Sequence, residues 1–253
     1  MTAFADLHVP GAPLLLPNAW DAASGAALVA AGFGAIGTTS LGVAAAAGKR
    51  DGTADAWEET LALAHRLTRL ECHVTVDLEH GFSEDPHAVA DYAAQLDGIA
   101  GVNLEDRHGD PEHHARVIAA VKERNPHLFV NARTDTHWLR EGESDDAIAR
   151  CRAYVEAGAD GVFVPGLPEH DIPTVARAVP RPLNVLFTPG QTIARLAELG
   201  VARVSTGSML FRAALQTTVA AAAAIRAGDD LAALRLPSYA AVDGLAGERD
   251  ELA

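Results

Sequence analysis

The chain is poor in cysteine. It has only two cysteines, Cys72 and Cys151, among 253 residues, and they form no CxxC pair. This scarcity excludes a disulfide framework and a structural zinc cluster built from cysteines, and it is typical of a protein in a reducing cytoplasm. Cys151 falls in a helical stretch, where a buried and inert thiol is expected. The cysteines therefore predict no chemistry.

Basic side chains are also scarce relative to acidic ones. Lys and Arg total 20 against 34 Asp and Glu, so the formal charge is −14 with histidine neutral. Nucleic acids and anionic membranes are bound through clustered Lys and Arg. The charge balance therefore argues against nucleic acid and membrane as partners.

Long hydrophobic runs are missing as well. The most apolar windows, 26–37 and 219–225, are too short to span roughly 30 Å of hydrocarbon. Residues 1–10 contain no basic stretch leading into an apolar run, as a secretory signal would. Hydrophobic residues nevertheless make up 49 % of the chain, so we expect a folded, soluble and cytoplasmic protein.

What the chain does contain is a regular alternation of short apolar runs and longer amphipathic segments. Several runs are continuously apolar, as expected for parallel strands covered on both faces. Eight such units without a dividing linker predict a (β/α)₈ TIM-type barrel, a fold of roughly 250 residues. A doubly wound open sheet is the alternative, but no Gly-x-Gly-x-x-Gly follows the first run. The eight runs are 14–19, 35–39, 73–77, 101–104, 128–132, 161–164, 183–187 and 203–205.

The predicted domain organisation is one barrel over 1–227 and a helical extension with a tail over 228–253. Ser144 is a candidate N-cap for a helix that ends before Gly158, and Pro189 and Gly200 mark a second helix. The Ala-rich stretch 213–227 predicts a final helix.

Conspicuous polar residues follow the predicted strands, and in a parallel barrel these ends converge on one mouth. Asp77, Glu79 and Glu105 offer hard carboxylate oxygens, which suit Mg²⁺ or Mn²⁺ better than a soft metal. Each could instead be a capping or salt-bridging residue. Three carboxylates at adjacent strand ends favour a metal site.

Two further features predict an anionic ligand. Arg133 could hold a carboxylate or phosphonate in a bidentate fork, or form an ion pair with Glu105 or Asp135. The turn formed by Thr39, Ser40 and Leu41 is built from small residues, so its backbone N–H groups could receive an anion. Such turns can also serve only as connections.

These residues lie in an ordered set of motifs that resembles the isocitrate lyase and phosphoenolpyruvate mutase superfamily. The likeness covers roughly 14–210, which is nearly the whole predicted barrel. It is carried by Asn18-Ala19-Trp20-Asp21, Gly32-Phe33-Gly34-Ala35-Ile36, Thr39-Ser40-Leu41, Asp51-Gly52, Asp77-Leu78-Glu79-His80-Gly81-Phe82, Asn103-Leu104-Glu105-Asp106, Ala132-Arg133-Thr134-Asp135, Ala157-Gly158-Ala159-Asp160 and Val164-Pro165-Gly166.

The resemblance implies roles for individual residues. Asp77 would bind Mg²⁺ directly, with Glu79, Glu105 and Asp51 helping through water. Thr39, Ser40 and Leu41 would receive a substrate carboxylate, and Arg133 a second anionic group. Asp51 and Arg133 are accordingly the candidate catalytic residues. Members of the superfamily commonly form dimers or tetramers that exchange the last helix, so the resemblance also predicts a homo-oligomer assembled through 211–225.

The chain departs from the superfamily pattern in places that decide the reaction. The usual Asp-x-Asp-x-Gly-Tyr-Gly is replaced here by Asp77-Leu78-Glu79-His80-Gly81-Phe82-Ser83. The gating segment of the lyase branch, which carries a Cys, and that of the mutase branch, which carries Lys and Asn, are both missing.

The leading prediction is a Mg²⁺-dependent lyase that cleaves a C–C bond of a small 2-oxo or 2-hydroxy di- or tricarboxylate, with decarboxylation an attractive variant. The alternatives are a phosphonomutase or phosphonopyruvate hydrolase, and a barrel that binds a 2-oxo acid without turnover.

Overall fold

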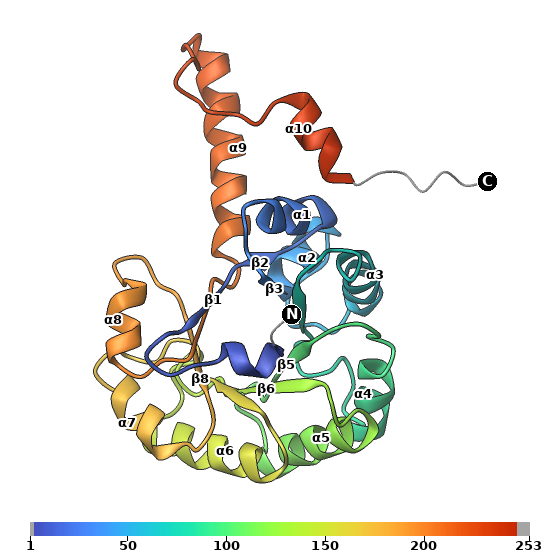
Figure 1. Ribbon diagram of the computed structural model, residues 1–253, viewed down its shortest axis with the longest axis vertical. Coiled ribbons are helices and arrows are strands. Elements are labelled where there is room, and N and C mark those ends of the chain that lie inside the picture. Colours follow the sequence, from blue (N-terminus) through green and yellow to red (C-terminus); the bar gives the residue numbers. More distant parts are fainter. Residues whose placement is uncertain (1–2, 247–253) are drawn as a thin grey trace, which may run out of the picture.

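A computed structural model of the protein describes residues 3–246. All nine strands are parallel and form one sheet in the order β1-β9-β8-β7-β6-β5-β4-β3-β2, and helices surround it (Figure 1). The strands are β1 Leu14–Leu16, β2 Asn18–Ala19, β3 Ala35–Thr38, β4 His73–Asp77, β5 Gly101–Glu105, β6 Phe129–Arg133, β7 Gly161–Phe163, β8 Leu183–Leu186 and β9 Arg203–Ser205. The predicted TIM-type barrel is therefore confirmed.

The first predicted strand is split in two because Pro17 has no N–H to donate to a ladder. Its first half, β1, pairs with β9, and its second half, β2, pairs with β3. The Asn18 side chain joins both neighbours: its Nδ2 donates to the Thr38 carbonyl at 2.7 Å, and its Oδ1 accepts from the Thr206 N–H at 2.9 Å. The sheet thus closes across this run.

The helices alternate with the strands along the chain. They are α1 Ala22–Ala30, α2 Ser40–Ala46, α3 Trp57–Leu67, α4 Pro86–Ala93, α5 Pro111–Arg124, α6 Ser144–Glu156, α7 Ile172–Ala178, α8 Ile193–Glu198, α9 Met209–Ala227 and α10 Tyr239–Asp243, with 3₁₀ turns η1 Phe4–Leu7 and η2 Gly244–Ala246. None of the helices in residues 3–246 is long and apolar enough to cross a membrane.

Three helix starts differ from the sequence prediction. Glu143, in extended conformation, is the N-cap of α6, so Ser144 is its first helical residue. In α8 the Thr192 hydroxyl accepts the Arg195 N–H, which leaves Pro189 in the turn before the helix. The last barrel helix, α9, begins at Met209 rather than at residue 213.

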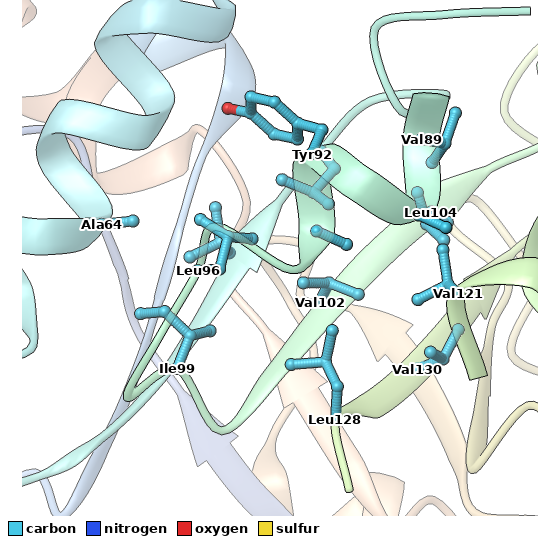
Figure 2. Close-up of a cluster of buried hydrophobic side chains, with 14 of the residues drawn as sticks. Ala64, Val89, Tyr92, Leu96, Ile99, Val102, Leu104, Val121, Leu128 and Val130 are labelled. Carbon is cyan, nitrogen blue, oxygen red and sulfur yellow. The ribbon is translucent and has the colours of Figure 1, made fainter. Parts of the chain in front are cut away.

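The largest buried cluster lies between the strands and the outer helices. Val102 and Leu104 of β5 meet Val89 and Tyr92 of α4, and Val121 of α5 faces the neighbouring strand (Figure 2). Burying side chains of this size stabilises the fold by about 1.5–3 kcal/mol each. This packing holds β4, β5 and β6, whose carboxyl ends carry the predicted acidic residues and Arg133, in fixed register.

Helix α9 extends away from the barrel, and the segment after it turns back toward α1 (Figure 1). Only Phe211 of its 19 residues is buried. The predicted extension over 228–253 contains α10 and η2, while its last part, 247–253, lies outside the described residues.

Candidate active site

A cavity of about 340 Å³ lies at the carboxyl ends of the strands. All of the predicted site residues except Glu79 line it: Thr39, Ser40, Leu41, Asp51, Asp77, Glu105 and Arg133. The parallel sheet accounts for this convergence, because the carboxyl ends of all its strands open at one mouth.

Arg133, the last residue of β6, is held by two carboxylates. Its Nη1 lies 2.9 Å from Glu105 Oε2, and its Nε donates to Asp135 Oδ1 at 2.6 Å. Burial disfavours the charged guanidinium, but Glu105, Asp135 and Asp77 outweigh it and raise the pKa of Arg133 above its usual value. Arg133 therefore forms both of the ion pairs that the sequence predicted as possible. They fix the orientation of its guanidinium group, which stays positively charged, on the cavity wall.

Asp77 ends β4 beside the turn that follows β3. Its backbone N–H donates to the Thr38 hydroxyl at 2.9 Å, and its Oδ2 accepts a long 3.5 Å hydrogen bond from the Ser40 N–H. The other oxygen, Oδ1, is buried without a partner. Burial raises the pKa of Asp77, Asp51 adds to this shift, and Arg133 opposes it.

Glu79 is buried behind the cavity wall rather than on it. Its backbone is left-handed, with φ 51°, so the alternation of strand β4 does not continue through it. Its Oε2 accepts the Ala54 N–H at 3.1 Å, which ties it to the loop that carries Asp51. Its Oε1 is buried without a partner, and burial raises its pKa.

Negative charge exceeds positive charge around Arg133. Burial raises the pKa of Glu105 to about 8, and Asp135, Asp77 and Glu79 add to this shift against the opposing effect of Arg133. A divalent cation would reverse such shifts, because it favours ionised carboxylates. The surplus of carboxylates and the unpartnered Asp77 Oδ1 fit Mg²⁺.

The arrangement fits a cation with few direct protein ligands. Among residues 3–246, no group of three or more His, Cys, Asp or Glu side chains is arranged to hold a metal ion. Mg²⁺ commonly keeps several waters and takes one or two carboxylates. Asp77 would then be a direct ligand, with Glu105 and Asp51 acting through water.

The turn after β3 brings the chain close to the ligand space. Helix α2 begins at Ser40, and no side chain caps it. A Cβ on Gly42 would lie 2.7 Å from both the Thr39 and Trp20 side chains, so only glycine allows this packing. The Thr39 N–H donates to the Ala19 carbonyl and the Ser40 N–H donates to Asp77 Oδ2, so an anionic ligand would be received by the N–H groups that follow in the first turn.

The floor of the cavity is a polar network that sequence reasoning missed. Asn103 and Ser205 line the cavity, and both contact Arg203, which is fully buried inside the barrel. Arg203 Nη2 donates to Asn103 Oδ1 at 3.2 Å, and its Nε donates to Ser205 Oγ at 3.3 Å. Burial lowers the pKa of Arg203 to about 9. Arg203 begins the short run Arg203-Val204-Ser205, and nothing in that run predicts that its side chain points into the barrel.

The connection between β5 and α5 spans only residues 106–110 and is held down by Asp106. One oxygen of this buried carboxylate accepts the N–H groups of Asp135 and His108, and the other accepts from Tyr154 and Arg150. Burial alone would raise the pKa of Asp106, but these hydrogen bonds outweigh it and lower the pKa. The connection is therefore a short, anchored loop rather than a lid.

A family model for phosphoenolpyruvate phosphomutase matches residues 4–226. The chain belongs to this family. An uncharacterized protein of Mycobacterium tuberculosis, Rv1998c, is 49 % identical over 235 residues, which cover 90 % of this chain and 91 % of the relative. An oxaloacetate decarboxylase of Paraburkholderia xenovorans is 32 % identical over 198 residues, which cover 70 % of this chain and 64 % of the relative.

A solved structure shares the fold at lower identity. The phosphonopyruvate hydrolase complex with oxalate and Mg²⁺ has a TM-score of 0.84 at 22 % identity, covering 96 % of this chain and 93 % of that one. At this identity the likeness shows the shared fold.

Proposed function

We propose that this protein is a Mg²⁺-dependent lyase that cleaves a C–C bond of a small 2-oxo or 2-hydroxy di- or tricarboxylate, with decarboxylation of a 2-oxo acid as the favoured form. The observation that carries the proposal is Asp77 Oδ1, a buried carboxylate oxygen without a partner, on the same cavity as Arg133. Mn²⁺ has the same ligand preference and could replace Mg²⁺.

Different residues of the cavity would bind the metal ion and the two anionic groups of the substrate. Asp77 would hold the cation directly, and Glu105 and Asp51 would hold its waters. The Thr39, Ser40 and Leu41 turn would receive the substrate carboxylate nearest the cation. Arg133 would receive a second anionic group. When bound, Mg²⁺ stabilises the negative charge that develops on the 2-oxo oxygen as the neighbouring bond breaks.

Glu79 has a different role in this proposal from the one its motif implies. Because its carboxylate accepts the Ala54 N–H and does not line the cavity, it would fix the loop that presents Asp51 rather than contact the waters of the cation.

Decarboxylation is favoured because it needs an electron sink but no thiol acid. Neither cysteine lines the cavity. Cys151 is fully buried, and burial raises the pKa of its thiol. The anchored loop 106–110 also offers no long segment to enclose a reactive intermediate.

The test is turnover of a panel of 2-oxo and 2-hydroxy di- and tricarboxylates with Mg²⁺. We expect release of CO₂, or of a 2-oxo acid or aldehyde, that is lost with a chelator and in Asp77→Ala. The control Glu58→Ala removes an exposed carboxylate and should keep full activity. Turnover that survives Asp77→Ala would exclude the proposal.

The second candidate is phosphonomutase or phosphonopyruvate hydrolase chemistry, which the family model supports. Phosphorus NMR with phosphonopyruvate distinguishes this candidate from the proposed lyase. Cleavage or transfer of the P–C bond changes the phosphorus signal, while an enzyme that cleaves only C–C bonds leaves it unchanged.

A third candidate is a barrel that binds a 2-oxo acid without turnover, which the absence of a cysteine on the cavity and of a long β5–α5 segment supports. Titration calorimetry would support it if oxalate bound in the presence of Mg²⁺ and no acid in the panel reacted.

The barrel would assemble as a homodimer or homotetramer through α9. Leu215, Val219 and Ile225 on this helix are exposed large apolar side chains, and a helix that buries only Phe211 gains little stability from its own barrel.

A further inference from the structure

Two asparagines line the cavity, Asn18 and Asn103, and their amides are bound differently. Both ends of the Asn18 amide are engaged, because its Nδ2 donates to the Thr38 carbonyl and its Oδ1 accepts from the Thr206 N–H. The Asn103 amide is bound through its oxygen, and its Nδ2 has no partner among residues 3–246. The NH₂ group of Asn103 is therefore free to bind a ligand.

Two donors hold the oxygen of Asn103. Asn131 Nδ2, on the neighbouring strand β6, donates to Asn103 Oδ1 at 2.9 Å. Arg203 Nη2 donates to the same atom at 3.2 Å. A carboxamide carries its oxygen and its NH₂ group on opposite sides of one planar group. Because the oxygen is anchored in the barrel interior, the NH₂ group is turned toward the cavity that Asn103 lines.

Arg203 determines which end of the Asn103 amide faces the cavity. A guanidinium group only donates hydrogen bonds, so the amide atom that it contacts must be the carbonyl oxygen. Asn131 could not enforce this by itself, because an asparagine can either donate or accept. Both amides could turn over together, with Asn131 Oδ1 accepting from Asn103 Nδ2. With Arg203 present, that arrangement is unfavourable because it sets two donors against each other.

The Arg203 side chain is held by neutral groups. It is fully buried, its Nε donates to Ser205 Oγ at 3.3 Å, and the Asn184 Nδ2 donates to the same hydroxyl at 3.1 Å. A buried charge whose hydrogen-bond partners are neutral contributes little to stability, because burial removes its hydration. Its position beneath Asn103 therefore favours a role in orienting the amide.

Asn103 lies beside the proposed metal ligand. Strands β4 and β5 pair in parallel with Asp77 in register with Asn103, and Glu105 follows two residues later on β5. Side chains in register or two residues apart point to the same face of a sheet. A ligand that chelates a cation on Asp77 would therefore bring an oxygen near Asn103. A neutral donor suits that oxygen, because it adds a hydrogen bond without competing for the cation.

We infer that Asn103 donates a hydrogen bond from Nδ2 to an oxygen of the bound 2-oxo acid, and that Arg203 is the positioning residue that keeps this NH₂ group turned toward the cavity. This inference rests on the proposed function. Without Arg203, the Asn103 carbonyl can face the anionic ligand, so that an attractive contact becomes a repulsive one.

Binding of oxalate in the presence of Mg²⁺, measured by titration calorimetry, tests the role of Asn103. Asn103→Ala removes the donor, and we expect the affinity to fall roughly 10- to 100-fold, as for the loss of a hydrogen bond to a charged group. Val121→Ala truncates a buried side chain in the outer helix layer (Figure 2). It controls for a general loss of stability and should bind oxalate as the wild type does.

A double-mutant cycle tests the role of Arg203. Arg203→Met removes the guanidinium group but keeps a long side chain, and we expect it to weaken oxalate binding about tenfold in the wild type. The same substitution should change the affinity by less than about threefold in Asn103→Ala, because no amide is left to turn over. Equal effects in the two backgrounds would show that Arg203 acts on the ligand through its charge alone.

NMR of isotope-labelled protein provides a measurement that does not depend on the folding of Arg203→Met. The side-chain NH₂ signals of Asn103 are the pair that is missing from the spectrum of Asn103→Ala. In the wild type this pair should shift when oxalate and Mg²⁺ are added, because the donor gains an anionic acceptor. Signals that stay in place while oxalate binds would overturn the inference.

The outcomes distinguish this inference from the proposed function. If oxalate does not bind to the wild type with Mg²⁺, the proposed function fails. If oxalate binds equally well to the wild type and to Asn103→Ala, only the role of Asn103 is overturned, and the proposed function stands.

Discussion

One carboxylate oxygen of Asp106 accepts a 3.0 Å hydrogen bond from the backbone N–H of Asp135. The Asp135 side chain in turn accepts the Nε–H of Arg133. Asp106, which is buried and does not line the cavity, therefore helps to set the orientation of the Arg133 guanidinium. Because Tyr154 and Arg150 hold the other oxygen of Asp106, helix α6 is connected to Arg133 through this carboxylate.

Asp106→Asn should therefore destabilise the fold. The substitution keeps the size of the side chain but places an NH₂ group against Arg150 or against a backbone N–H. Disrupting a buried ion pair costs about 3–5 kcal/mol when one charge is left uncompensated. We expect the free energy of unfolding, measured in urea, to fall by about 3 kcal/mol. Tyr154→Phe, which removes a single hydrogen bond to the same carboxylate, should cost about 1–2 kcal/mol. Equal stability of Asp106→Asn and the wild type would contradict this account.

The pKa of Glu105 predicts a pH-dependent stability. Burial raises this pKa to about 8 in the folded protein, from an ordinary value of 4.5. The folded state thus holds the proton more tightly than the unfolded state, so the contribution to stability is complete below about pH 4.5 and is lost as the pH rises through 8. In metal-free protein we expect Tm to fall between pH 5 and pH 8.5.

Glu105→Gln is the control for that measurement, because its side chain does not titrate. Its Tm should fall less over the same pH interval, while charge repulsion elsewhere in the protein remains. Mg²⁺ favours the ionised carboxylate, so it should raise Tm of the wild type more at pH 8 than at pH 5. A parallel decline in the two proteins would show that Glu105 has an ordinary pKa.

The sequence predicts the barrel well because parallel strands buried on both faces appear as short apolar runs. Each of the eight predicted runs matches the observed strand or strands to within one residue at either end, and the one division, at Pro17, follows from its missing N–H. The carboxyl ends of β4, β5 and β6 place Asp77, Glu105 and Arg133 on one cavity, as position alone predicts.

The sequence is less informative where the backbone leaves regular structure. The left-handed conformation of Glu79 directs its carboxylate to the Asp51 loop, and no strand periodicity reports this. Trp138 and Phe163 lie far apart in the sequence, and only the tertiary fold places both against Arg133. Arg203 is not predicted for a similar reason, since one of its two partners, Asn103, comes from β5.

Arg133→Lys should weaken ligands that carry a second anionic group. A lysine keeps the charge but cannot donate to Glu105 and Asp135 from a fixed planar fork. We expect affinity for a four-carbon 2-oxo dicarboxylate to fall roughly 10- to 100-fold, with a much smaller effect on pyruvate. Arg195→Lys makes the same change at an exposed arginine that also contacts two carboxylates, Glu169 and Glu198. A similar loss in both variants would show that Arg133 does not contact the ligand.

Substitutions on helix α9 test whether the protein forms a homodimer or homotetramer through this helix. Isolated helices are marginally stable in water, and this one exposes Val219 to 66 % and Ile225 to 65 %. A second copy of the chain would bury these side chains, so light scattering should give a mass of two or four chains. Val219→Glu combined with Ile225→Glu should lower that mass, because burying an unpaired charge at an interface is costly. Gln216→Glu adds a charge at another exposed position of the same helix and should leave the mass unchanged. A wild-type protein that is monomeric at all concentrations would mean that α9 is stable without a partner chain.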